Sequence, residues 1–392
     1  MKLSIEQVEL GGRRVFLRAD LNAPLEHGAV SDDTRLTAVL PTIALALERG
    51  AAVVLASHLG RPQGRPDPKY TLKPVAERLQ ALLERPVPLA PDCVGDAVEG
   101  LARALKPGEI LLLENLRFHP EEEANDDAFA RRLAGLADLY VNDAFAAAHR
   151  AHASIAAITR HLQPAAAGLL MRRELEALGR ILEAPARPLV AVLGGAKVSD
   201  KISLVEHLLS KVDALVIGGG MAFTFLRALG HGVGKSLVEV DRIEMARSTL
   251  EAARRRGVNI VLPVDAVVAA GLDSPSGRAV SVRDIPAEQM GLDLGPLSVE
   301  RFATVLRSAK TIVWNGPMGV FEKPAFATGT VAVARAVAES SAFTVIGGGD
   351  TVAAVNQAGV TNRIGYISTA GGAFLEFLEG RALPGVEALT EA

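Results

Sequence analysis

A recurring pattern of short apolar runs is the feature that most restricts the fold of this chain. Each run is rich in Val, Ile and Leu, alternates little with polar residues, and ends in a glycine or polar cluster before an amphipathic stretch begins. Strands buried on both faces of a parallel sheet have this composition, and the stretches between them predict helices. The sequence therefore predicts an α/β fold of the doubly wound, parallel-sheet kind. The predicted strands are residues 15–20, 53–57, 110–114, 139–143, 189–195, 214–220, 259–265, 311–316, 343–350 and 364–369.

The length of the chain, 392 residues, predicts two lobes. One domain takes about 100–200 residues, and about ten strands divide comfortably into two sheets. We expect the division at residues 169–185, where apolar residues follow helical spacing and Pro185 and Pro188 stop the helix. This segment then links a lobe of residues 1–168 to a lobe of residues 186–377. The alternative is one more helix packed inside a single domain.

Composition excludes several classes of protein. A net charge of −3 and 4% aromatic residues argue against a nucleic-acid-binding surface. The single cysteine, Cys93, excludes a disulfide framework and fits a reducing, cytoplasmic environment. No uncharged apolar run reaches the length of a membrane span, about 18 residues. Glu6 and Glu9 stand where a signal peptide needs an apolar core.

The residues that follow the strands of an open parallel sheet form its ligand site. In the first half of the chain these residues are mainly cationic, and an arginine fork suits carboxylates and phosphates. Taken singly, His58 or His149 is more simply explained by a structural role, and Arg18 or Arg117 is also explained as a salt-bridged surface residue. The candidates are Arg18, Asp20, Asn22, Arg35, His58, Arg61, Arg117, Asp143, His149 and Arg150.

The second half of the chain carries glycine turns at its strand ends instead. Backbone N–H groups at such turns hold phosphates with the help of the helix dipole, and a neighbouring Asp can hold Mg²⁺. One such turn alone is more simply a tight connection, so the prediction depends on their recurrence. The candidates are Gly194, Gly195, Lys197, Lys201, Gly218, Gly219, Gly220, Asn315, Gly316, Gly347, Gly348, Gly349, Asp350, Thr351, Gly371 and Gly372.

Neither of the common nucleotide-binding motifs is complete. The stretch 229–236 fails the P-loop pattern because Leu229 stands at its first glycine, and two GxGxxG-like stretches fail at Phe223 and Val352. A basic half and a glycine-turn half nevertheless predict a phosphoryl-transfer enzyme. Two alternatives are a non-catalytic anion-binding protein and a nicotinamide-dependent dehydrogenase.

A series of motifs resembles phosphoglycerate kinase along essentially the whole chain. In order, they read RRVFLRADLNAP, SHLGRP, LLENLRFH, YVNDAF with AHRAHAS, LGGAKVSDKI, IGGGMAFTFL, WNGPMGVFE, IGGGDT and STAGGA. The resemblance implies two lobes joined by a helix, with a C-terminal tail, residues 378–392, returning to the first lobe. It also implies a monomeric glycolytic enzyme that interconverts 1,3-bisphosphoglycerate and ADP with 3-phosphoglycerate and Mg-ATP.

In the first lobe, the resemblance assigns phosphoglycerate binding to the basic candidates. It implies that Asp20 and Asn22 take the hydroxyl and carboxylate end of this substrate, and that Arg35 lies at the transferring group. The remaining implied contacts are His58, Arg61, Arg117, His149 and Arg150.

In the second lobe, the resemblance assigns nucleotide binding to the glycine turns. It implies that Lys197 and Lys201 bind the phosphates, that Asp350 holds Mg²⁺, and that Glu322 contacts the ribose. The implied adenosine site is Gly194, Gly195, Gly218, Gly219, Gly220, Gly291, Leu292 and Pro317. The implied phosphate contacts are Asn315, Gly348, Gly349 and Thr351.

The chemistry implied by the resemblance needs no nucleophilic side chain, because an acyl phosphate is already activated. Charge spreads over the phosphoryl oxygens during transfer, so positioning and cations carry catalysis. The implied catalytic residues are Arg35, Lys197, Gly371 and Gly372. Arg35 and Lys197 stand on different lobes, so we expect the cleft between the lobes to close.

Two positions depart from the usual family pattern. Ala370 replaces a glycine in STAGGA, and Ala146 with Ala147 replaces Gly-Thr before the AHR motif. If residue 370 requires a positive φ, alanine is strained there. The second departure leaves the local loop geometry open.

Overall fold

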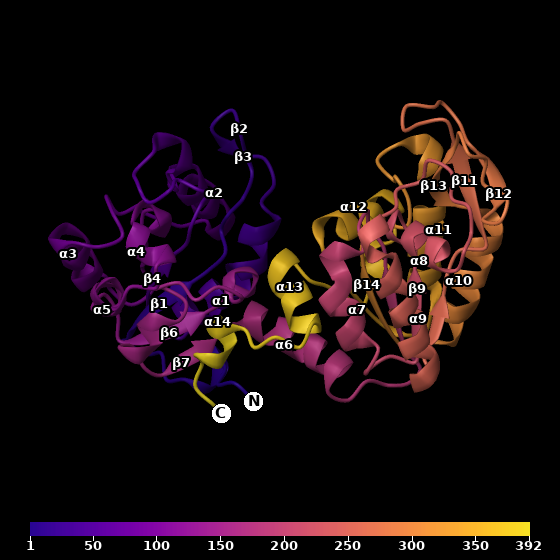
Figure 1. The fold of residues 1–392 in the computed structure, drawn as a ribbon. Coiled ribbons are helices and arrows are strands. Elements are labelled where there is room, and N and C mark those ends of the chain that lie inside the picture. Colours follow the sequence, from indigo (N-terminus) through magenta and orange to yellow (C-terminus); the bar gives the residue numbers. More distant parts are fainter. The chain divides into compact units, whose positions relative to one another are not determined.

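The computed structural model describes residues 1–392 (Figure 1). The chain divides into two compact units: the first unit is Met1–Glu176 with Ala382–Ala392, and the second unit is Ala177–Arg381. The boundary falls inside helix α6 (Leu169–Leu182). None of the helices combines the length and the apolar character that a membrane crossing requires.

The first unit is built on a five-stranded parallel sheet in the order β5-β4-β1-β6-β7. Its strands are β1 (Arg14–Arg18), β4 (Ala52–Ala56), β5 (Ile110–Leu112), β6 (Leu139–Asn142) and β7 (Ala165–Ala167). A two-stranded hairpin, β2 (Leu25–Glu26) with β3 (Ala29–Val30), precedes the first helix. The helices are α1 (Thr34–Glu48), α2 (Lys73–Leu83), α3 (Asp96–Ala104), α4 (Pro120–Glu123) and α5 (Asp127–Ala134).

The second unit is built on a six-stranded parallel sheet in the order β10-β9-β8-β14-β15-β16. Its strands are β8 (Leu189–Leu193), β9 (Ala214–Ile217), β10 (Asn259–Val261), β14 (Thr311–Asn315), β15 (Phe343–Ile346) and β16 (Tyr366–Ile367). Its helices are α7 (Ile202–Leu208), α8 (Met221–Ala228), α9 (Ile243–Arg256), α10 (Pro296–Ser308), α11 (Thr328–Glu339), α12 (Gly349–Gln357) and α13 (Gly371–Leu378). The central strands β8 and β14 are completely buried, as a sheet covered on both faces requires. The predicted α/β class with parallel sheets is confirmed.

The prediction of one strand over residues 259–265 is wrong. The run divides into β10 and the start of β11 (Asp265–Ala269), which lies in a separate antiparallel sheet with β12 (Arg278–Ser281) and β13 (Met290–Leu294). Pro263 stands between the two strands, and proline can neither donate to a ladder nor leave its fixed φ. The antiparallel sheet was not predicted because β12 is partly exposed and too polar to form an apolar run.

Three predicted strands extend too far into their glycine clusters. Strand β8 ends before Gly194, β9 before Gly218 and β15 before Gly347. The φ angles of Gly195 and Gly348 are +109° and +95°, which lie outside the extended region. The chain therefore turns away from the sheet at these glycines.

The C-terminal segment returns to the first unit. The backbone N–H of Leu3 donates to the carbonyl oxygen of Thr390 at 2.8 Å, and the N–H of Thr390 donates to the carbonyl oxygen of Ala165 at 2.9 Å. A short helix, α14 (Pro384–Glu387), lies in this segment. Figure 1 shows both termini beside β7. The predicted return of the tail is confirmed.

Candidate functional site

A fully buried arginine lies at the carboxyl end of β1 in the first unit. The Arg18 Nε donates to the Ser154 hydroxyl at 2.9 Å, and its Nη2 lies 3.2 Å from His58 Nδ1. Ser154 in turn donates to the buried Glu122 carboxylate through both its N–H and its hydroxyl. A buried cation needs a partner charge and full hydrogen bonding, and this network provides both. We call Arg35, His58, Arg61, Arg117, His149 and Arg150 together the basic surface. Arg18 is a buried residue that contacts one of them, His58.

The structure brings Asp20, Asn22 and Arg35 together. The Arg35 Nη1 donates to Asp20 Oδ2 at 2.8 Å, and the Asn22 N–H donates to Asp20 Oδ1 at 3.1 Å. The Asn22 side-chain oxygen accepts from the Gly60 N–H at 2.9 Å. The Arg35 side chain remains 37% exposed, so its guanidinium can still reach a ligand.

Two further predicted arginines lie around the same loop. The Arg117 Nη1 donates to the Gly60 carbonyl oxygen at 2.9 Å, and its Nε lies 3.3 Å from the Glu123 carboxylate. The neighbouring Arg61 is exposed and has no side-chain partner. The backbone at Gly60 is therefore hydrogen-bonded to both Asn22 and Arg117, and Arg61 is the next residue of the same loop.

A second pair of predicted residues follows β6. The Arg150 Nε lies 3.2 Å from His149 Nε2. Arg150 acts electrostatically on both Arg117 and His152, which connects this pair to the basic surface. His152 was not among the predicted residues, although it stands in the AHRAHAS motif that carried the resemblance.

Burial and mutual repulsion set the protonation of this basic surface. Burial, followed by the charges of Arg18 and Arg117, holds the pKa of His58 well below its ordinary value. The same causes lower the pKa of His152 to about 3. Both histidines are therefore neutral at pH 7, while the arginines keep their charges. Burial lowers the pKa of Arg117, and Arg18 and Arg150 add to this effect, although Glu123 acts against it. A bound anion would add a further opposite charge to this group of cations.

The glycine turns of the second unit allow three loops to approach one another closely. The Gly195 N–H donates to the Pro317 carbonyl oxygen at 2.9 Å, and the Gly219 N–H donates to the Met318 carbonyl oxygen at 3.0 Å. A Cβ atom on Gly194 would lie 2.1 Å from the Pro317 oxygen, and one on Gly219 would lie 2.6 Å from the Gly195 oxygen. Both distances are too short for any side chain, so glycine is required at both positions.

One of the two predicted lysines is held in place. The Lys201 Nζ donates to the backbone oxygen of Asn315 at 3.2 Å and also to the Asn315 side-chain oxygen. Burial lowers the pKa of Lys201 to about 8, although Asp200 and Asp350 act against this shift. Lys197 is exposed and makes no side-chain hydrogen bond or ion pair. The ammonium of Lys201 is therefore held in one position, whereas the side chain of Lys197 can change its position to meet a ligand.

Helix α12 begins directly beside Asn315. The Asn315 Nδ2 donates to the Gly347 carbonyl oxygen at 2.7 Å, and the Thr351 hydroxyl accepts from the Gly316 N–H at 2.6 Å. Asp350 stands in the first turn of the helix with an exposed carboxylate that has no partner. The helix N-terminus attracts anions, and this free carboxylate suits a hard cation such as Mg²⁺.

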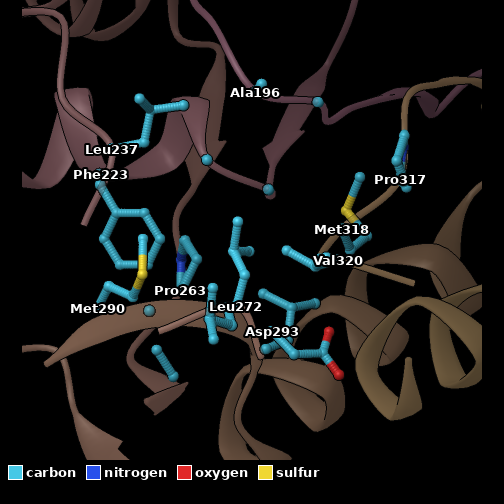
Figure 2. Close-up of a pocket in the computed structure, with 18 of the residues that line it drawn as sticks. Ala196, Phe223, Leu237, Pro263, Leu272, Met290, Asp293, Pro317, Met318 and Val320 are labelled. Atoms are coloured by element: carbon cyan, nitrogen blue, oxygen red, sulfur yellow. The ribbon is translucent and has the colours of Figure 1, made fainter. Parts of the chain in front are cut away.

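A cavity of about 440 Å³ opens beside these turns, within the second unit (Figure 2). In Figure 2, Phe223 and Met290 lie across the cavity from Met318 and Val320. The cavity has mainly apolar walls. Its charged lining residues are the buried Asp293 and the exposed Glu322 and Asp350, and these two exposed residues are called its margin. The predicted residues that line it are Gly195, Gly219, Gly220, Gly291, Leu292, Pro317, Glu322 and Asp350.

Other predicted residues of the second unit lie outside the cavity lining. They are Gly194, Lys197, Lys201, Gly218, Asn315, Gly348, Gly349, Thr351, Gly371 and Gly372. Asn315 contacts Lys201, Gly348 caps α12, and Gly349 and Thr351 lie in the first turn of that helix. The main wall residues that the sequence did not single out are Phe223, Leu237, Leu272, Met290, Met318 and Val320. Apolar residues of this kind are indistinguishable from core residues in a sequence; only the position of Phe223 inside IGGGMAFTFL could have indicated its role.

The two departures from the family pattern fit the backbone without strain. Ala370 precedes α13 with a φ of −104°, so the position does not require glycine. Gly371 and Gly372 form the first turn of this helix, and a Cβ on Gly371 would meet no atom within 4 Å. Ala146 and Ala147 lie in a 3₁₀ turn, Phe145–Ala147, and neither has a positive φ.

Comparisons with known proteins agree with these features. The phosphoglycerate kinase family model matches residues 5–381. The phosphoglycerate kinases of Moorella thermoacetica and Acidobacterium capsulatum are 57% and 56% identical to the chain, covering all of it and 99% of each relative. The structure of phosphoglycerate kinase from Coxiella burnetii aligns with a TM-score of 0.93 at 44% identity, covering 99% of this chain and 98% of that one. The enzyme from Pyrococcus horikoshii aligns with a TM-score of 0.84 at 36% identity, with the same coverage.

Proposed function

The chain belongs to the phosphoglycerate kinase family, and we propose that its first unit binds phosphoglycerate and its second unit binds the Mg-nucleotide. The reaction is the glycolytic phosphoryl transfer between 1,3-bisphosphoglycerate with ADP and 3-phosphoglycerate with ATP. Family membership decides against both alternatives, the non-catalytic anion-binding protein and the dehydrogenase.

The observation that supports the nucleotide assignment most strongly is the composition of the cavity in the second unit. An apolar space of about 440 Å³ adjoins glycine turns, and the carboxylate of Asp350 stands at its margin. A nucleotide has the same division, with a flat apolar base at one end and phosphates at the other. Ligand cavities typically combine apolar walls with a few placed polar groups in this way.

We assign the adenosine to the cavity. Phe223 and Met318 supply apolar surface for the base, and Glu322 is placed at the margin for the ribose hydroxyls. The glycines keep the floor free of side chains, so the base can approach the backbone. The assigned adenosine residues that line the cavity are Gly195, Gly219, Gly220, Gly291, Leu292 and Pro317. Gly194 and Gly218, which lie outside the lining, are assigned with them because they belong to the same glycine turns.

We assign the nucleotide phosphates to the region around Asn315 and the start of α12. The ammonium of Lys201 is already oriented by Asn315, while the unpartnered Lys197 is free to follow the transferring group. The amides of Gly348 and Gly349 and the dipole of α12 add positive potential, and Thr351 fixes the adjoining loop through Gly316.

We assign the nucleotide-bound Mg²⁺ to Asp350. Its carboxylate is exposed, unpartnered and at the cavity margin, and carboxylate together with phosphate oxygens is the ligand set that Mg²⁺ prefers. The ion would neutralise charge on the phosphate oxygens. The residues of the chain supply the remaining positive potential.

We assign 3-phosphoglycerate to the basic surface of the first unit. Asp20 and Asn22 are positioned for its hydroxyl and carboxylate, and Arg35 stands next to them. We assign the non-reacting phosphate mainly to Arg61, Arg117 and Arg150, with His58 and His149 as the remaining contacts. His58 is neutral at pH 7 and therefore acts as a hydrogen-bonding group rather than as a charge.

Transfer then proceeds directly between the two substrates. A carboxylate oxygen of 3-phosphoglycerate forms a bond to the γ-phosphorus, and the bond from that phosphorus to the ADP oxygen breaks. No proton has to be removed from a carboxylate, so no general base is required. Arg35, Lys197 and the amides of Gly371 and Gly372 would stabilise the charge on the transferring oxygens. Because these residues belong to both units, we propose that hinge bending brings the substrates together during turnover.

We further propose that the enzyme works as a cytoplasmic monomer without nucleic-acid or membrane partners. In this proposal the lobes are residues 1–168 with the tail 378–392, and residues 186–377, joined by the segment 169–185, which contains α6. The near-neutral charge of −3 and the single cysteine support it.

A coupled assay tests the proposed function. Purified protein receives Mg-ATP and 3-phosphoglycerate, and glyceraldehyde-phosphate dehydrogenase reports 1,3-bisphosphoglycerate through the loss of NADH. We expect turnover that stops when Mg²⁺ is chelated. Calorimetry with Mg-ADP alone tests the nucleotide site separately. Turnover independent of Mg²⁺, or an absence of nucleotide binding, would contradict the assignments of Asp350 and the cavity.

A further inference from the structure

Three potential metal ligands meet in the first unit, apart from the substrate residues. Asp92 and Cys93 stand in the segment before α3, and His119 stands directly before α4. A carboxylate oxygen, a thiol sulfur and an imidazole nitrogen from these residues lie within 4.8 Å of one another. Neither the phosphoglycerate site nor the nucleotide site uses any of the three.

The local structure already orients this group. The His119 Nε2 lies 2.7 Å from Asp92 Oδ1, which also accepts from the Cys93 N–H at 2.6 Å. The His119 ring stacks on Phe129 with a centroid distance of 5.3 Å. Cys93 is completely buried, whereas the Asp92 side chain is 44% exposed. The group therefore has a fixed inner side and an open outer side.

We propose that Asp92, Cys93 and His119 form a binding site for one divalent transition-metal ion of the Zn²⁺ class. Thiolate and imidazole ligands select such ions over Mg²⁺, which prefers oxygen alone. Three protein ligands leave one position of a tetrahedral ion for water, and the exposed side at Asp92 provides the access. The site is thus chemically distinct from the Mg²⁺ position at Asp350.

A small rearrangement would accommodate the ion. Bonds of about 2.0–2.3 Å place tetrahedral ligand atoms about 3.3–3.8 Å apart. The Asp92–His119 pair, at 2.7 Å, has to open slightly, and the more distant atoms have to approach. Asp92 can make this adjustment because it is partly exposed, while Cys93 stays in place. The ion replaces the hydrogen bond between Asp92 and His119, and the thiol releases its proton to solvent.

The location of the site predicts a structural effect. His119 lies between Arg117, which contacts the Gly60 loop, and Glu122, which holds Ser154. An ion on His119 would tie this stretch to the segment at Asp92 and Cys93. We therefore expect bound metal to stabilise the first unit. This inference does not depend on the substrate assignments above.

Cobalt(II) is the probe that tests the site. Tag-free, full-length protein is reduced, stripped with chelator and titrated with Co²⁺ in the absence of nucleotide. We expect one ion per chain, a thiolate-to-cobalt charge-transfer band in the near ultraviolet, and visible bands of a tetrahedral ion. Added Zn²⁺ should remove these bands and raise the melting temperature.

Variants with a matched control identify the ligands. We expect Cys93→Ser to abolish the charge-transfer band, and His119→Gln and Asp92→Asn to weaken Co²⁺ binding by at least about tenfold. The control is His161→Gln, because His161 Nε2 also contacts an aspartate, Asp127 Oδ1, at 2.9 Å but has no cysteine beside it. This control should bind Co²⁺ as the parent protein does.

The possible results separate the site from adventitious binding. Circular dichroism establishes that each variant is folded. If Cys93→Ser is unstable, Asp92→Asn still tests the site, because Asp92 is half-exposed. A missing charge-transfer band in the parent protein would overturn the proposal. Binding that His119→Gln and Asp92→Asn leave unchanged, or that His161→Gln weakens equally, would overturn it as well.

Discussion

The Lys201 ammonium donates to both oxygens of Asn315, the backbone carbonyl oxygen at 3.2 Å and the side-chain oxygen. The same burial that fixes this arrangement lowers the pKa of the lysine to about 8. Lysine in water titrates near pH 10.4. The group assigned to the nucleotide phosphates therefore changes its charge close to physiological pH.

We predict that nucleotide affinity falls as the pH rises through about 8. Phosphate binding favours the ammonium form, so at pH 9 the protein has to take up a proton when Mg-ADP binds. If the bound state requires the ammonium, a pKa of about 8 makes the Kd about tenfold larger at pH 9 than at pH 7. Calorimetry in buffers of different ionisation enthalpy measures both the Kd and the proton uptake.

The variant Lys201→Met isolates this effect. It should bind Mg-ADP more weakly at pH 7 and show no proton uptake at pH 9. Lys197→Met should weaken binding but retain the pH dependence, because Lys201, the titrating group, is still present. Equal affinity of the parent protein at pH 7 and pH 9 would contradict the assignment.

The buried carboxylate of Asp293 predicts an unusual dependence of stability on pH. Burial raises the pKa of Asp293 to about 7, although its Oδ2 accepts from the Gly329 N–H at 2.6 Å. Its Oδ1 is buried without a partner. A pKa that is higher in the folded state means that the folded protein retains the proton longer. The stabilisation that comes from this protonated Asp293 is complete below about pH 4, the pKa of an aspartate in the unfolded chain. It is lost as the pH rises through about 7, the pKa in the folded protein.

We expect Asp293→Asn to remove this dependence. Between about pH 4 and pH 7 the unfolding free energy of the parent protein should fall relative to the variant, by at most about 1.4 kcal/mol per pH unit. Urea unfolding across this range measures the difference. Asp284→Asn, at an exposed position, is the control and should track the parent. Parallel pH profiles for the parent and Asp293→Asn would contradict the prediction.

The sequence predicted most strands of the parallel sheets because buried strands leave short, nearly continuous apolar runs. It predicted the antiparallel sheet of the second unit poorly, since β12 is partly exposed and Pro263 joins two strands into one apparent run. Strand β7, Ala165–Ala167, is three alanines, and alanine has little preference for strands. These elements are specified by their neighbours rather than by their own residues.

The candidate polar residues were predictable because they follow the ends of apolar strands in the sequence, whereas the walls of the cavity were not predictable. Phe223 and Met290 resemble core residues in the sequence and differ only in facing the cavity. His152 was not predicted because a single histidine in a sequence does not by itself indicate a binding role. Its importance follows from the surrounding arginines, which only the fold brings together.

The contact between Gly291 and Phe223 predicts a change in nucleotide binding. A Cβ on Gly291 would lie 2.0 Å from the Phe223 ring, so Gly291→Ala has to displace the ring into the cavity or away from its wall. Overpacking of this kind costs about 1–3 kcal/mol of stability, and we expect the Kd for Mg-ADP to rise at least about tenfold. Gly232→Ala is the control, because its Cβ would meet nothing within 4 Å. Unchanged nucleotide affinity in Gly291→Ala would contradict the assignment of Phe223 to the nucleotide-binding site.

The partly exposed guanidinium of Arg35 predicts a specific loss of rate. If it stabilises the transferring phosphoryl group, Arg35→Ala should lower kcat by about 10³-fold, as the loss of an arginine finger does, with a smaller change in the nucleotide Kd. Arg78→Ala is a matched control from the same unit, because Arg78 pairs with Asp33 and has no assigned role. Steady-state kinetics on both variants gives the comparison. A kcat within tenfold of the parent for Arg35→Ala would refute its catalytic role.

The backbone at Ala370 makes the restored family motif a test of strain. With a φ of −104°, alanine is comfortable at this position, and its side chain is completely buried. Ala370→Gly, which recreates STGGGA, should therefore bring no gain in kcat, because Gly371 and Gly372 already begin α13. It should lower the unfolding free energy by about 0.4–1 kcal/mol, since glycine gains more entropy on unfolding. Thermal unfolding and the coupled assay measure the two quantities on one preparation. A variant that is both faster and more stable would show that alanine strains this turn.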